Sequence, residues 1–161
     1  MVKFRPSASL QINPNRHACG EPVCTILVRY ESREARLLDR YLLVLIGGGL
    51  GALARYIAAT FITQRYGGLF PWGTFAINVT GSFAIGLLMT IFTERVMHPY
   101  WRLLLVVGFL GGYTTFSSFE YETLQAVRSG ARWIGLLNVV CSVAFGYAAV
   151  WLGVLMGGSG K

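Results

Sequence analysis

From residue 41 onward, the chain alternates between long apolar runs and short polar connections. A bilayer core needs about 20 apolar residues in helical conformation, so each run predicts one transmembrane helix. The expected spans are residues 41–64, 72–92, 103–127 and 133–156. Aromatic residues mark the ends of these spans, as expected of an interfacial belt: Tyr41, Tyr66, Trp72, Trp101 and Trp133. The pattern therefore predicts an all-α integral membrane protein with four transmembrane helices, a multi-pass protein of the cell membrane.

Composition supports this class, because 54% of the residues are hydrophobic and 13% are charged, against about 25% charged in a soluble domain. The net charge of +7 does not indicate a nucleic-acid partner, since no basic segment is interleaved with aromatic residues. Residues 1–40 hold seven of the 14 Lys and Arg residues and four of the seven acidic ones. We expect residues 1–40 to form a basic, poorly ordered extension, with 31–40 compatible with a short helix. Residues 41–161 then form the four-span domain.

Basic residues outside the extension are balanced between the two membrane sides. One side collects Arg95, Arg102 and Lys161, and the other collects Arg65, Arg128 and Arg132. Because positive residues favour the cytoplasmic side, this balance predicts that the four-span domain inserts in both orientations. The extension opposes this, because its arginines near the first span favour a cytoplasmic N-terminus.

The third run contains a polar interruption at membrane depth. Gly111 and Gly112 are followed, after Tyr113, by Thr-Thr-Phe-Ser-Ser at 114–118. Each glycine costs a helix about 1 kcal/mol relative to alanine, so we predict that the third helix is broken at Gly111-Gly112. Unwound backbone in a membrane must be buried in protein or face a polar cavity, where its carbonyls can bind a small cation. A kinked, well-packed helix is the alternative interpretation.

Each span also offers polar side chains, which together outline a track. Thr74 and Asn78 are four residues apart on one helical face, as are Asn138 and Ser142. The first span adds the guanidinium of Arg55. The third span adds one helical face and two hydroxyl residues: Phe116, Phe119 and Glu122 on the face, with Thr115 and Ser117. Singly, such groups more often make interhelical hydrogen bonds than ligand sites. Because most of the track donates hydrogen bonds, it favours an anion.

Three segments resemble the fluoride channels of the Fluc/CrcB family: GGGLGALARY at 47–56, PWGTFAINVTGSFAIG at 71–86 and GFLGGYTTFSSFEYE at 108–122. The resemblance covers about residues 41–156, and residues 1–40 have no counterpart. It implies a fluoride-selective channel that exports cytoplasmic fluoride passively. It also implies an antiparallel, dual-topology homodimer with two pores and a central structural sodium ion. A paralogue of opposite orientation is the alternative partner.

The resemblance also implies roles for individual residues. The backbone carbonyls of Gly111 and Thr114 would bind sodium, and Phe116 and Phe119 would be pore phenylalanines. Asn78 would line the pore. Other matching positions belong to the polar track or the first span: Arg55, Thr74, Glu122 and Ser142. Asn138 departs from some members, which carry tyrosine there. The positive edge of an aromatic ring can coordinate an anion weakly, and weak binding at several sites suits conduction.

Two other functions compete with a channel. A small proton-coupled multidrug-type exporter also has four spans, but it needs an intramembrane carboxylate, and Glu120 and Glu122 stand at the end of the third run. An intramembrane enzyme is disfavoured because both histidines lie outside the spans, which leaves the serines there without a base. We therefore expect no enzymatic activity.

Overall fold

The computed structural model describes residues 22–95 and 97–158. The chain divides into two units, Met1–Arg36 and Leu37–Lys161. In the first unit the described residues belong to helix α1, which begins at Pro22 and continues into the second unit to end at Tyr66. This helix includes residues 31–40, where the sequence is compatible with a helix. Residues 1–21 lie outside the described residues, and their expected lack of order stays a prediction.

The second unit confirms the four predicted spans. Helices long and apolar enough to cross a membrane are Leu37–Tyr66, Trp72–Glu94, Pro99–Arg128 and Arg132–Gly158. The first is the later part of α1, the second is α2 (Trp72–Glu94) and the fourth is α6 (Arg132–Gly158). The third consists of four consecutive elements: α3 (Pro99–Trp101), η1 (Arg102–Leu110), α4 (Gly111–Tyr113) and α5 (Phe116–Arg128). The protein is a multi-pass membrane protein.

The third span begins four residues before the expected residue 103, because the preceding loop supplies a helix start. The imidazole Nδ1 of His98 accepts a hydrogen bond from the Tyr100 N–H at 3.4 Å. Pro99 occupies the first helical turn, where a missing N–H costs nothing. Element η1 that follows is a π-helix of nine residues, a form found mostly as short segments near functional sites.

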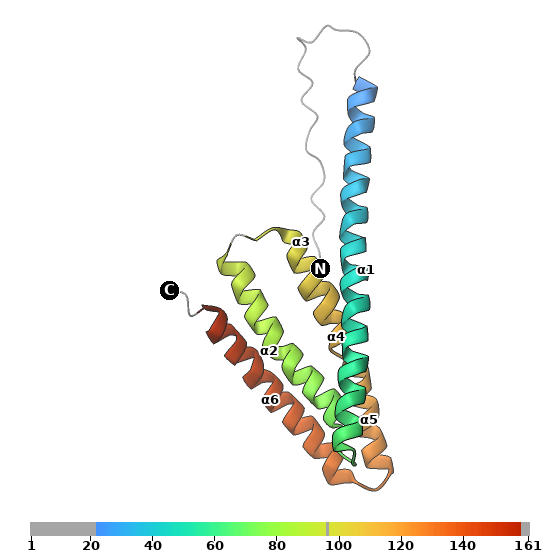
Figure 1. The fold of residues 1–161 in the computed structure, drawn as a ribbon, viewed down its shortest axis with the longest axis vertical. Coiled ribbons are helices and arrows are strands. Elements are labelled where there is room, and N and C mark those ends of the chain that lie inside the picture. Colours follow the sequence, from blue (N-terminus) through green and yellow to red (C-terminus); the bar gives the residue numbers. More distant parts are fainter. Residues whose placement is uncertain (1–21, 96, 159–161) are drawn as a thin grey trace, which may run out of the picture. The chain divides into compact units, whose positions relative to one another are not determined.

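Glycines allow the spans to pack backbone against backbone. Helices α2 and α6 lie side by side (Figure 1), and a Cβ atom on Gly86 or Gly153 would meet the backbone of the opposite helix. Helix α1 packs on the third span in the same way, because Gly112 lies against the backbone of Gly48. Small residues at helix contacts are the usual means of close approach in membranes.

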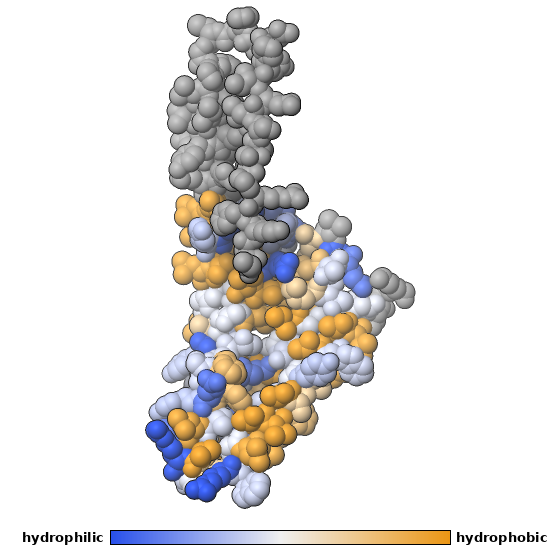
Figure 2. Space-filling view, turned by 180° about the vertical axis from the view of Figure 1, so that it is seen from behind, coloured by the Kyte–Doolittle hydropathy of each residue, from blue (hydrophilic) through white to orange (hydrophobic). Residues whose placement is uncertain are grey.

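Many large apolar side chains of the second unit are exposed, and Figure 2 shows groups of apolar residues (orange) on one face. Large hydrophobic residues with more than half of their surface exposed include Leu45, Phe61 and Val143. The two largest fully buried side chains are Ile77 and the polar Asn138. Exposed apolar side chains together with a buried, hydrogen-bonded asparagine are compatible with a domain whose solvent is lipid.

The break in the third span lies at Thr114–Thr115, so its predicted position at Gly111-Gly112 is wrong. Gly111 has helical dihedral angles (φ −62°, ψ −36°), whereas Thr114 (−81°, 157°) and Thr115 (−149°, 122°) are extended. Gly112 is needed for close packing on α1 rather than for unwinding, whereas a Cβ atom on Gly111 would meet nothing within 4 Å. Side chains from α2 and α1 bond the backbone at the two threonines, as described below.

Candidate functional site

Asn78 holds the break in its extended conformation. Its amide Nδ2 donates to the Thr115 carbonyl at 2.9 Å, and its Oδ1 accepts from the Thr115 N–H at 2.9 Å. The side chain therefore bonds the backbone of Thr115 as a neighbouring β-strand would. Nδ2 carries a second N–H, which leaves a donor for a ligand at the same place.

Thr115 also caps the helix that follows the break. Its Oγ1 accepts from the Ser118 N–H at 3.3 Å and donates to the Ser118 Oγ at 3.0 Å. This is an N-cap, a role that threonine commonly fills. The first N–H groups of α5, those of Phe116 and Ser117, lie at the positive end of the helix dipole, where negative charge is stabilised.

Two carbonyls at the break lose their helical donors. In an uninterrupted helix the Thr115 N–H would bond Gly111, but it donates to Asn78. Likewise, the Ser118 N–H would bond Thr114, but it donates to the Thr115 hydroxyl. The guanidinium Nη1 of Arg55 lies 3.5 Å from the Thr114 carbonyl oxygen, so this partly buried arginine faces the break from α1.

These two carbonyls fit a hard cation, which prefers oxygen ligands. In the part of the chain that the structure describes, no group of three His, Cys, Asp or Glu residues could hold a metal ion. Backbone oxygens at the break are therefore the candidate ligands there, at the two positions that the resemblance implies, Gly111 and Thr114.

A cavity of about 410 Å³ lies beside the break, bounded by α2, η1, α5 and α6. It brings together seven of the residues predicted from sequence: Asn78, Gly111, Thr114, Thr115, Phe116, Phe119 and Ser142. The rings of Phe116 and Phe119 are 5.8 Å apart between centroids and inclined by 37°. Phe116 is 70% exposed, so this side of the cavity is open at the surface of a single chain.

A chain of hydrogen bonds continues from this cavity between α5 and α6. The Ser142 hydroxyl donates to Asn138 Oδ1 at 3.3 Å, and Asn138 Nδ2 donates to the Thr123 Oγ1 at 2.8 Å. Thr123 in turn donates to the Phe119 carbonyl at 2.7 Å. Asn138 is 1% exposed and does not line the cavity; it joins the two helices. Sequence reasoning missed Thr123, although its position four residues after Phe119 places it on the same helical face.

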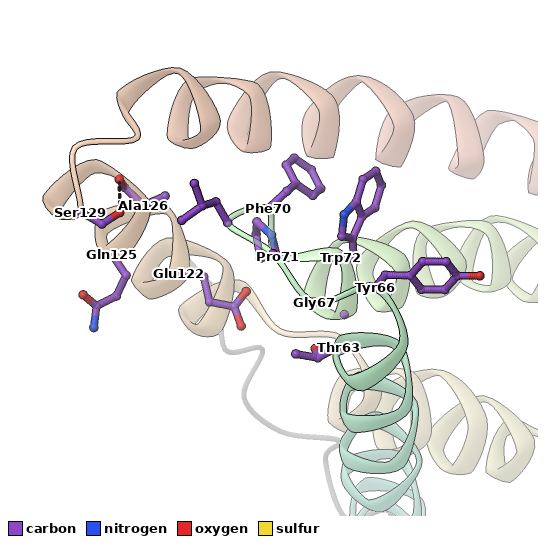
Figure 3. A pocket seen from close by; sticks show the side chains of 13 residues that line it. Thr63, Tyr66, Gly67, Phe70, Pro71, Trp72, Glu122, Gln125, Ala126 and Ser129 are labelled. Carbon is purple, nitrogen blue, oxygen red and sulfur yellow. Dashed lines mark hydrogen bonds between the residues drawn. The ribbon is translucent and has the colours of Figure 1, made fainter.

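Glu122 and Thr74 lie apart from the cavity beside the break. The Thr74 side chain is hydrogen-bonded to the Glu122 carboxylate, and no described residue bonds the buried Oε2 of Glu122. Glu122 borders a second cavity of about 380 Å³, formed by the end of α1, the connection to α2 and the later part of α5. Figure 3 shows its carboxylate extending from α5 toward Thr63 and Pro71.

The remaining predicted residue, Ser117, is exposed on the first turn of α5 and borders neither of these cavities. Within a single chain, the polar residues predicted to form one track therefore lie in three separate groups. One group surrounds the break, a second joins α5 to α6, and a third lies toward the α1–α2 connection.

Comparison with known proteins assigns this chain to a family. Residues 42–154 match the family model described as CrcB-like protein, Camphor Resistance (CrcB). A protein of Solibacter usitatus named fluoride-specific ion channel FluC is 65% identical over 118 residues, which are 73% of this chain and 97% of that protein. Proteins of the same name are 51% identical in Acidobacterium capsulatum (73% and 95% covered) and 45% identical in Coxiella burnetii (72% and 95% covered). The chain belongs to the CrcB family.

Proposed function

We propose that this protein is a fluoride-selective ion channel that lets cytoplasmic fluoride leave the cell passively. The name shared by its relatives supports a fluoride channel and gives no support to the small proton-coupled exporter. The observation in the structure that carries the proposal is the cavity at the break, where Asn78, the α5 N-terminus and two phenylalanines meet.

The cavity offers what a small, strongly hydrated anion requires. Fluoride loses water on entering a narrow path, and the free N–H of Asn78, which lines the cavity, is a donor that replaces it. The positive end of α5 adds a favourable potential. Ring edges of Phe116 and Phe119 bind an anion weakly, so the ion is held without being trapped, as conduction requires.

A second chain completes this path in our proposal. Phe116 is largely exposed in a single chain, and closed two-fold symmetry is the commonest way for chains to pair. The pair is antiparallel, with the axis in the membrane plane. The Gly111 and Thr114 carbonyls of both chains then surround one structural sodium ion, whose charge holds the two breaks together. The protein lies in a lipid bilayer.

Flux from liposomes tests the function. The purified protein is reconstituted into vesicles loaded with potassium fluoride. A potassium ionophore is added so that potassium leaves with fluoride and no membrane potential builds up to stop the efflux. A fluoride electrode should record rapid efflux that is independent of a pH gradient. Vesicles loaded with potassium chloride and read with a chloride electrode should release no chloride. Absence of fluoride efflux, or efflux that requires a proton gradient, would refute the channel.

A further inference from the structure

The last helical turn before the break is tied to α2 by a hydrogen bond between two side chains. The Tyr113 hydroxyl lies 3.0 Å from Thr80 Oγ1. The Thr80 hydroxyl itself donates within α2, to the Ala76 carbonyl at 2.7 Å and the Ile77 carbonyl at 3.1 Å. Because a threonine hydroxyl has one proton, Tyr113 is the donor to Thr80.

This bond belongs to a set of contacts through which α2 holds three consecutive residues of the third span. Tyr113, directly before the two extended residues, bonds Thr80. Thr115, the second extended residue, is held to α2 by the two backbone bonds described above. Thr114 lies between them, and a Cβ atom on Gly81 would overlap its methyl group. The fit at Gly81 therefore places Thr114 directly against α2.

The same contacts orient the Thr114 carbonyl. The peptide bond between Thr114 and Thr115 is planar and trans, so its C=O and N–H point in opposite directions. Its N–H is directed to Asn78 of α2. The carbonyl is therefore directed away from α2, and the Arg55 guanidinium of α1 lies 3.5 Å from it. Asn78 fixes this peptide group on one side of Thr114, and Tyr113 fixes the backbone on the other.

The segment before the break needs such a tether because it contains two adjacent glycines. Glycine restricts the backbone less than any other residue, and α4 consists of Gly111–Tyr113 alone. The Tyr113 ring is also stacked on the Phe109 ring, with centroids 5.9 Å apart and planes inclined by 9°. The hydroxyl bond is exposed in a single chain, but a membrane supplies few other partners for a hydroxyl group. The tether thus limits the movement of the backbone that carries the Gly111 and Thr114 carbonyls.

We infer that Tyr113 is a positioning residue for the cation site and acts through its hydrogen bond to Thr80. The inference rests on the sodium ion of the proposed function, for which the Gly111 and Thr114 carbonyls are the ligands. Ligands that are already held in place bind more tightly than ligands that must be ordered on binding. Loss of the Tyr113 hydroxyl should therefore lower the affinity for sodium without removing any ligand.

Melting of the purified protein at different sodium concentrations measures this affinity. The protein is purified with N-methylglucamine as the cation and equilibrated with increasing sodium at constant ionic strength. A ligand that binds the folded protein raises the melting temperature as its concentration increases.

Two substitutions remove the bond from either side. Tyr113→Phe removes the donor and keeps the ring, and Thr80→Val removes the acceptor. Each variant should need about three- to tenfold more sodium than wild type for the same rise in melting temperature above its own sodium-free value. One hydrogen bond changes an equilibrium constant by about this factor. The double variant should need no more sodium than either single variant, because both substitutions remove the same bond.

Two control variants separate this bond from other effects of the substitutions. Thr80→Ser keeps the hydroxyl acceptor and should respond to sodium as wild type does. Tyr121→Phe makes the same change in the same span, but the Tyr121 hydroxyl accepts from Gln125 of its own helix at 2.7 Å. Its sodium requirement should therefore equal that of wild type.

A merely structural Tyr113 gives a different result. Tyr113→Phe would then melt at a lower temperature at every sodium concentration, with an unchanged sodium requirement. That result would overturn the inference, and so would a wild-type protein whose melting does not respond to sodium. Failure of the channel is seen separately, as absence of fluoride efflux from vesicles that carry the wild-type protein.

Discussion

Replacing Asn78 by alanine tests how the break and the ion path depend on one side chain. The substitution removes both 2.9 Å hydrogen bonds to the Thr115 backbone. Each buried backbone group left unpaired costs about 1–3 kcal/mol. The bonds are partly buried and cavity water can replace part of them, so we expect a total loss of about 2–4 kcal/mol.

This loss is large enough to change the conformation of the break. Because about 1.4 kcal/mol corresponds to a tenfold change in an equilibrium constant, the extended backbone at Thr115 becomes poorly populated. The ion also loses the free Nδ2 donor. We expect fluoride efflux to fall at least about tenfold, together with a lower midpoint of thermal unfolding in detergent.

Two further variants make the Asn78 experiment decisive. Asn78→Asp keeps an oxygen for the Thr115 N–H but sets a carboxylate against the Thr115 carbonyl and against the anion, so it should also abolish efflux. Thr93→Val removes a hydroxyl that bonds the Met89 carbonyl of its own helix, and should leave efflux unchanged. Wild-type efflux from Asn78→Ala would show that this amide neither shapes the break nor contacts fluoride.

Other predictions use the same flux and melting measurements. Phe116→Ile and Phe119→Ile should each abolish or strongly slow efflux while the protein still melts cooperatively. Phe145, an exposed ring of α6, lies outside the cavity, so Phe145→Ile should leave efflux unchanged. Normal efflux from both Phe116→Ile and Phe119→Ile would remove these two rings from the ion path. Gly112→Ala should lower stability by about 1–3 kcal/mol through overpacking against α1. Gly49→Ala adds a Cβ that meets nothing within 4 Å, so it should be neutral or stabilising by up to about 1 kcal/mol. Equal melting temperatures of the two variants would contradict the packing argument. Exchange of sodium for a bulky organic cation during purification should lower activity and melting temperature, and indifference to sodium would leave the break without a bound cation.

Sequence alone determined the number of spans and identified most of the polar residues of the candidate site. Uncharged runs of bilayer length have few alternatives to a transmembrane helix, so the four spans follow from composition along the chain. Asn78 and the hydroxyl run after Gly112 stood out because polar groups in lipid must find partners.

Tertiary structure decided where the third helix breaks and how the polar groups divide. Glycine propensity placed the break at Gly111-Gly112, but propensity is weaker than packing, and Gly112 is held in a helix against Gly48. Unwinding occurs at Thr115 because Asn78, 37 residues earlier, satisfies the backbone there. Similarly, Asn138 bonds Thr123 inside the bundle instead of lining the cavity. Such partners lie on different helices, and only the packing of those helices determines which polar groups meet.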